Sequence, residues 1–397
     1  MSSGGPVQLP SSALGQALLA ATLLGASTLT VMSGATIAPA LPAIAEHFKS
    51  LPDARFLTQL SLTVPALFIV LASPLAGYLA DKSGPKPVLA VSTVIYILAG
   101  SSGLFLDGLI DILIGRALLG VSVAGILTAA ISLIGGCYEG HRRNRILGWQ
   151  SAAMSLGGVI YITAGGFLAD FGWRLPFAIY AVPVILLPTL FFLVPDIRER
   201  QDAEAREAAG DIPWKLFALA YAAAFVAILA YYVIPVQLPF LLLEIGAPEP
   251  STAALTIACA SLTSAVVASL YGRIRQILSG RASITLTFLL IGAGLTVVGS
   301  AAGLPAVVGG MILSGAGLGL MFPALVGLIL EDAAPHIRGR ASSGLTMAVF
   351  LAQFLSPVVM AAVAGGGTAE WFSLAGQGTL AAGAALVAWF VWIRARR

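Results

Sequence analysis

The stretch Gly77-Tyr-Leu-Ala-Asp81-Lys82-Ser-Gly84-Pro-Lys86 joins two long apolar runs, residues 56–80 and 86–106. Each run is long enough to cross a bilayer, which takes about 20 apolar residues. The short stretch brings together one acid, two lysines, two glycines and a proline. This composition predicts a tight polar hairpin between two membrane helices.

The composition of the whole chain agrees with a membrane protein. The 397 residues are 58% hydrophobic and only 10% charged, whereas a soluble domain carries roughly 25% charged residues. So few charges cannot solvate the surface of a soluble protein of this length. The apolar runs predict twelve spans, at residues 14–41, 56–80, 86–106, 109–133, 146–168, 174–194, 215–242, 251–272, 283–302, 305–330, 341–364 and 371–393.

The distribution of Lys and Arg predicts the orientation, because these residues concentrate in cytoplasmic loops. All but four of the 21 lie in loops on the side of the N-terminus; the others are Lys49, Arg55 and Arg174 on the opposite side and Arg116 inside a span. We therefore expect both termini in the cytoplasm and a multi-pass protein of a bacterial-type plasma (inner) membrane. No Lys or Arg precedes the first apolar run, so we expect this run to be kept as a span rather than cleaved as a signal peptide.

The two halves of the chain repeat each other weakly. The segment 272–281 is a degenerate copy of 77–86 without the acid, and 335–340 parallels 141–145. We therefore expect an all-α membrane protein with twelve transmembrane helices in two pseudo-symmetric six-helix bundles. The expected division is an N-terminal bundle at 1–194, a cytoplasmic linker at 195–213 and a C-terminal bundle at 214–397.

Several motifs resemble those of one transporter family. The pattern Gly77-x-x-x-Asp81-Lys82-x-Gly84-x-Lys86 resembles the loop between the second and third spans of the major facilitator superfamily. The run Arg116-Ala-Leu-Leu-Gly120 resembles the Arg-x-x-Gln-Gly motif of its drug/proton antiporters, with Leu119 in place of Gln. By these motifs the chain is similar to the 12-span bacterial drug/proton antiporter-type members. The resemblance implies a secondary transporter that works by alternating access, and not an enzyme.

The resemblance also implies a conformational latch, formed by Gly77, Asp81, Lys82, Gly84 and Lys86. Asp81 follows the negative end of its own helix dipole. In this fold the positive N-terminal end of span eleven approaches that corner while the cytoplasmic side is closed, so Asp81 would stabilise the outward-open state. The alternative is an acid of a solvated loop.

Among all Lys, Arg, Asp and Glu residues of the sequence, only Arg116 lies well inside a predicted span. A cation there is costly and is by default a functional hypothesis. By resemblance Arg116 takes part in proton coupling or substrate contact, with Asp111 as a candidate partner. The two are five residues apart on one helix, which makes direct contact poor. The alternative is a structural arginine that donates hydrogen bonds to helix-end carbonyls.

The resemblance also implies a central cavity lined by spans one, four, seven and ten, with help from five and eleven. No Asp, Glu or His lies at mid-span, which favours a neutral or anionic substrate. The mixed aromatic, Met and amide side chains expected in the cavity suit a bulky amphiphilic one. Span five keeps Gly157, Gly165 and Gly166 of an antiporter motif, but Tyr161 and Ile162 replace its Gly-Pro pair. The candidate cavity-lining residues are Thr28, Met32, Tyr161, Tyr231, Tyr232, Gln237, Ser314, Phe350, Gln353 and Phe354.

These features lead to one preferred function and two alternatives. We expect proton-coupled efflux of amphiphilic organic compounds or drugs by a monomer, with no cofactor, no metal site and no nucleic-acid partner. The first alternative is uptake or exchange of a small organic anion with Arg116 as counter-ion. The second is a sensing role in which transport has been lost. ATP-driven transport is not expected, because no Gly-x-x-x-x-Gly-Lys-Ser/Thr loop occurs in the sequence.

Overall fold

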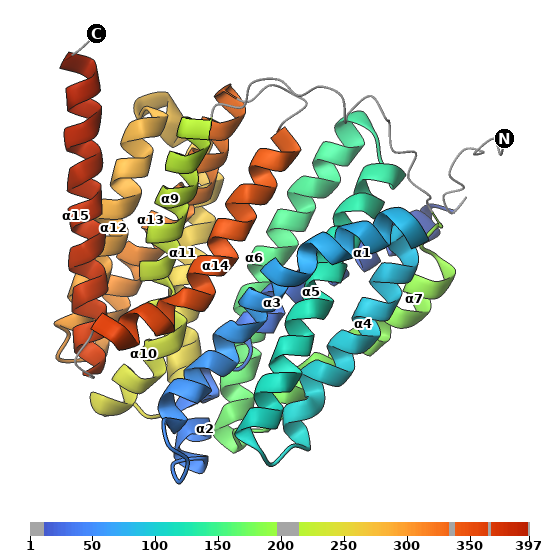
Figure 1. The fold of residues 1–397 in the computed structure, drawn as a ribbon, viewed down its shortest axis with the longest axis horizontal. Coiled ribbons are helices and arrows are strands. Elements are labelled where there is room, and N and C mark those ends of the chain that lie inside the picture. Colours follow the sequence, from blue (N-terminus) through green and yellow to red (C-terminus); the bar gives the residue numbers. More distant parts are fainter. Residues whose placement is uncertain (1–11, 197–213, 333–337, 364–366, 396–397) are drawn as a thin grey trace. The chain divides into compact units, whose positions relative to one another are not determined.

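The computed structural model describes residues 12–196, 214–332, 338–363 and 367–395, which are helical except for short connections (Figure 1). Within these residues, twelve segments are long and apolar enough to cross a membrane. The all-α fold with twelve spans is therefore confirmed, with boundaries that differ from the predicted ones by a few residues. The segments are Ala13–His47, Ala54–Ser83, Pro85–Leu104, Leu109–Cys137, Gly140–Phe171, Leu175–Phe192, Phe217–Glu244, Pro250–Ile277, Gly280–Gly299, Leu304–Leu328, Ser343–Val363 and Thr368–Ala388.

The contacts divide the chain into two compact units. The first unit contains residues 1–37 and 60–201, and the second contains residues 38–59 and 202–397. The division expected from the sequence, at 194 and 214, stays a prediction. Most of the expected linker, residues 197–213, lies outside the described residues.

The described residues of the first unit form eight helical elements, one of them shared with the second unit. They are α1 (Ala13–Ala35), the larger part of α3 (Ala54–Ser83), α4 (Pro85–Ser101) with the short η2 (Ser102–Leu104), α5 (Leu109–Cys137), α6 (Gly140–Phe171), η3 (Leu175–Leu186) and α7 (Leu187–Phe192).

The second unit begins with η1 (Ala38–Ala40), α2 (Leu41–His47) and the first turns of α3. Its remaining helices are α9 (Trp214–Tyr231), α10 (Val233–Glu244), α11 (Pro250–Ile277), α12 (Gly280–Gly299), α13 (Leu304–Asp332), α14 (Arg338–Val363) and α15 (Thr368–Ala395).

Local sequence explains where several helices begin. Gly84 adopts a φ of 88°, and Pro85 then starts α4; a positive φ is accessible to glycine at little cost, and proline suits the first helical position. The Ser279 side chain accepts a hydrogen bond from the backbone N–H of Ala282 and caps α12. Span six is a 3₁₀ helix over η3, where Pro176 and Pro183 each remove one backbone donor.

Small residues let the helices of each unit approach closely. In the first unit, a Cβ on Gly120 would lie 2.8 Å from the Cα of Pro65, so α5 and α3 cross nearly backbone to backbone. In the second unit, a Cβ on Gly310 of α13 would lie 2.6 Å from the carbonyl oxygen of Gly294 of α12. Close packing at glycine is the usual way in which membrane helices gain contact without a hydrophobic driving force.

Candidate functional site

Arg116 is the most deeply buried charged side chain in the described part of the chain, with 1% of its surface exposed. Its Nε donates a hydrogen bond of 2.8 Å to the carbonyl oxygen of Ser61 on α3, and its Nη1 donates one of 2.9 Å to the hydroxyl of Tyr180 on η3. Its Nη2 donates to the carbonyl oxygen of Ser33 on α1. The guanidinium therefore joins four spans of the first unit.

Tyr180 is the partner of Arg116 that the sequence analysis missed. The carbon Cζ of Arg116 lies 5.3 Å from the centroid of the Tyr180 ring, and the Tyr180 hydroxyl also donates to the Ser33 carbonyl oxygen at 3.1 Å. A Cβ on Gly100 would lie 2.6 Å from the Cβ of Tyr180, so this glycine leaves the space that the tyrosine fills. The Tyr180 ring and the backbone carbonyl dipoles thus stabilise the buried guanidinium, which has no carboxylate partner among the described residues.

Asp111 does not contact Arg116. It lies exposed in the first turn of α5, where a carboxylate interacts favourably with the helix dipole. The salt bridges among the described residues are Lys49–Glu46 and Arg174–Asp107. Asp111 instead borders a groove of about 470 Å³ between α4 and α5, and the groove's rim residues Leu98 and Ile114 are 68% and 57% exposed. A shared coupling role for Arg116 and Asp111 remains a prediction.

Two predicted cavity residues of the first unit meet directly. The hydroxyls of Thr28 on α1 and Tyr161 on α6 share a hydrogen bond of 2.8 Å. A Cβ on Gly157 would lie 3.1 Å from the Cβ of Thr28, so that glycine supports the close approach of the two helices. Met32, one turn beyond Thr28, is fully buried. The structure thus places Tyr161 in contact with span one, at the position where the antiporter motif has glycine.

The predicted cavity residues of the second unit lie on three spans. Gln237 is 1% exposed, and Ser314 is fully buried. The Nε2 atom of Gln237 and the Oγ atom of Ser314 have no hydrogen-bond partner in the described chain. Tyr231 is buried and Tyr232 half-buried, and α14 carries the half-buried Phe350, Gln353 and Phe354.

The side-chain amide oxygen of Gln237 accepts a hydrogen bond from an arginine that the span prediction assigns to a loop on the side opposite to the N-terminus. Arg55, at the start of α3, donates from Nη2 to Oε1 of Gln237 at 3.1 Å. The two residues are far apart in the sequence and lie on different spans. The sequence therefore offered no signal that would have paired them.

The latch residues lie at the end of α3 and the start of α4. Asp81 and Lys82 are exposed and Lys86 is half-buried; Nζ of Lys82 lies 5.7 Å from the centroid of the Tyr78 ring. A Cβ on Gly77 would meet no described atom within 4 Å. The expected partner segment near 340–342 has no described side chains, so the latch stays a prediction.

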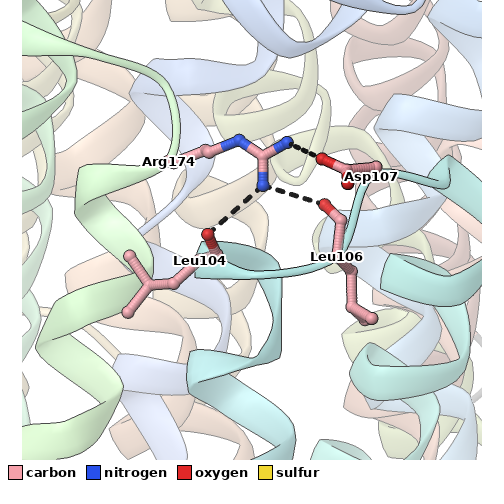
Figure 2. A network of polar contacts seen from close by, with 4 residues as sticks. All are labelled: Leu104, Leu106, Asp107 and Arg174. Atoms are coloured by element: carbon pink, nitrogen blue, oxygen red, sulfur yellow. Dashed lines mark hydrogen bonds and ion pairs between the residues drawn. The ribbon is translucent and has the colours of Figure 1, made fainter.

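Arg174 forms a network of polar contacts with the segment that connects α4 and α5 (Figure 2). Its Nη1 donates to the carbonyl oxygens of Leu104 and Leu106 at 3.2 and 3.0 Å, and its Nη2 lies 2.6 Å from a carboxylate oxygen of Asp107. The arginine thus fixes the connection between α4 and α5, which borders the groove at Leu106. Because the Asp107 side chain is 92% exposed, this ion pair contributes little energy and mainly sets the shape of the loop.

Comparisons with known proteins agree with this architecture. The model of the Major Facilitator Superfamily matches residues 23–221. Niacin transporter NiaP of Acinetobacter baylyi is 29% identical over 129 residues, which are 32% of this chain and 29% of that protein. Multidrug resistance protein 1 of Bacillus subtilis is 31% identical over 170 residues, which are 41% of this chain and 42% of that protein. The matched stretches thus span less than half the length of these curated relatives.

A solved structure shows the same fold over nearly the whole chain. The bacterial homologue of the human lysosomal transporter Spinster, in an inward-facing and occupied conformation, matches with a TM-score of 0.77. The match covers 97% of this chain and 98% of that chain at 17% sequence identity. At this identity the similarity concerns the fold alone.

Proposed function

Because this chain belongs to the major facilitator superfamily, and is thus a multi-pass secondary transporter of small molecules and not an enzyme, we propose that it exports amphiphilic organic compounds in exchange for protons. The relatives with drug-resistance names support this proposal. So do the motifs around Asp81 and Arg116. The proton gradient would supply the energy, and the proposed location is a bacterial inner membrane with both termini in the cytoplasm.

The single observation that supports this substrate class most is the engagement of Arg116. All three of its nitrogen positions donate hydrogen bonds within the first unit, and 1% of its surface is exposed. In this conformation the guanidinium is not available as a counter-ion. The half-buried residues of the predicted cavity then offer aromatic rings and one amide, which suit a bulky amphiphile better than a small ion. They are Tyr161, Tyr232, Phe350, Gln353 and Phe354.

Uptake or exchange of a small organic anion is the second candidate. It is favoured by the similarity to a protein named as a niacin transporter, since niacin is a carboxylic acid. For Arg116 to act as counter-ion, its bonds to Ser33, Ser61 and Tyr180 would have to be exchanged for the substrate. This candidate therefore requires a rearrangement of the first unit during transport.

Transport in proteoliposomes under an imposed pH gradient separates the two candidates. The assay compares a lipophilic dye with a set of organic anions, in parallel vesicles with and without the gradient. Dye movement that depends on the gradient is expected for efflux by proton exchange. Movement of the anions alone, lost in Arg116→Ala but kept in the exposed control Arg142→Ala, would overturn the efflux proposal.

A further inference from the structure

Residues 38–59 contain the end of span one, the turn after it and the start of span two, and they pack in the second unit. Within that unit, η1 and α2 contact α10, and η1 also contacts α11. The chain leaves the first unit after Ile37 and returns to it at Leu60. Any relative motion of the units must therefore either bend the chain at these two points or detach the segment 38–59 from the second unit.

Arg55 holds this segment by contacts with two other helices. Its Nη2 donates to Oε1 of Gln237 on α10 at 3.1 Å and to Oγ1 of Thr368 at the start of α15 at 2.8 Å. Its Cζ lies 4.5 Å from the centroid of the Phe240 ring, also on α10. The Thr368 hydroxyl in turn donates to the carboxylate of Glu244 at the end of α10.

Arg55 donates hydrogen bonds to two side chains that are almost completely buried, Gln237 and Thr368. Gln237 and Thr368 are each 1% exposed, while Arg55 and Glu244 reach the surface. Nε2 of Gln237 has no hydrogen-bond partner among the described residues. Within the described chain, the side-chain amide of Gln237 is therefore hydrogen-bonded through Oε1 to Arg55 alone. A buried polar group that loses its partner destabilises the state in which it is buried.

We propose that Arg55 is a positioning residue of the transport cycle, which clasps the segment 38–59 to α10 and α15 and releases it when that end of the protein opens. By span count, Arg55, Glu244 and Thr368 all lie on the side opposite to the N-terminus. A secondary transporter of this superfamily exposes its central site alternately to the two sides. Release of the clasp would thus accompany opening on the side that we propose to be outside. This inference rests on the transporter function but not on the identity of the substrate.

Cysteine accessibility tests the clasp without a substrate. In a background of Cys137→Ala and Cys259→Ala, Leu41→Cys places a thiol on α2, where the side chain is fully buried. Replacing Arg55 with Gln removes the charge-assisted bonds, and losing one such bond changes an equilibrium by about tenfold. We therefore expect a maleimide to label Leu41→Cys about tenfold faster in Arg55→Gln than in its parent.

Controls separate gating from a general loosening of the fold. Lys49→Gln removes a charge from the same segment, but the interaction that is lost is an exposed ion pair with Glu46. The labelling rate at residue 41 should therefore not change. A second reporter, Ala80→Cys near the other end of α3, is buried in the first unit and should label no faster in Arg55→Gln. Arg55→Lys, which keeps a cation, should label at an intermediate rate.

Three results would overturn the inference. The first is a labelling rate at residue 41 of Arg55→Gln within about twofold of the parent's rate, because a twofold change corresponds to less than the weakest net hydrogen bond. The second is an equal acceleration of labelling at residues 41 and 80, and the third is the same acceleration in Lys49→Gln. If labelling changes as expected but no transport of the proposed substrates is found, the result counts against those substrates and not against the clasp. The turnover rate of Arg55→Gln, once a substrate is known, should change more than its KM.

Discussion

Replacing Arg116 with alanine is expected to destabilise the first unit as well as to alter transport. Three spans lose a bond to the guanidinium, at the Ser33 and Ser61 carbonyl oxygens and the Tyr180 hydroxyl. A hydrogen bond to a charged group contributes about 1.5 kcal/mol or more, so three contribute roughly 4–5 kcal/mol. Removing the buried cation returns part of its desolvation cost, which leaves a net loss of about 3 kcal/mol.

The assay is thermal unfolding of the purified protein in one detergent, followed by transport in liposomes. For a unit of 150–250 residues, about 3 kcal/mol corresponds to a Tm lower by roughly 6–12 °C. The matched control is Arg142→Ala. Arg142 is exposed and donates to Gln16 at 2.8 Å, so its loss should lower the Tm by no more than about 2 °C.

A double-mutant cycle with Tyr180→Phe tests the same network. Tyr180→Phe removes the hydroxyl that accepts from Arg116 at 2.9 Å, so the two losses of stability should not be additive. An unchanged Tm in Arg116→Ala, together with lost transport, would refute the structural reasoning. Arg116 would then act on the substrate or the proton and not on the packing of the four spans.

Three further substitutions test the remaining features. Asp81→Asn should reduce transport while leaving the Tm close to that of the parent; full transport activity would rule out the latch. Gly165→Ala should lower stability by about 1–3 kcal/mol in thermal unfolding, because its Cβ would lie closer than 3.0 Å to the backbone of Thr36. Gly148→Ala, which would meet no described atom within 4 Å, is its control, and an equal loss there would contradict the packing argument. Gly84→Ala should cost roughly 1 kcal/mol because of the φ of 88°, and an unchanged unfolding temperature would show that the hairpin can change its backbone conformation.

The sequence alone determined the class of the protein and the number of its spans. Runs of about 20 apolar residues leave no other spanning structure than helices, because every backbone polar group must find its partner within the segment. Gly84 and Pro85 mark the break between α3 and α4 for similarly local reasons. The position of Arg116 within a span was also evident, since this residue stands inside an apolar run.

Only the tertiary structure decided what the buried side chains contact. Arg116 meets Tyr180 rather than Asp111, and Arg55 reaches Gln237 and Thr368, although these partners lie on other spans. A local pattern reports which face of a helix is apolar, but on membrane helices that are apolar all round it does not report which face meets which neighbour. Contacts between distant segments depend on how closely the backbones approach, and that approach is set by the packing of residues such as Gly100 and Gly120 against the helices beside them.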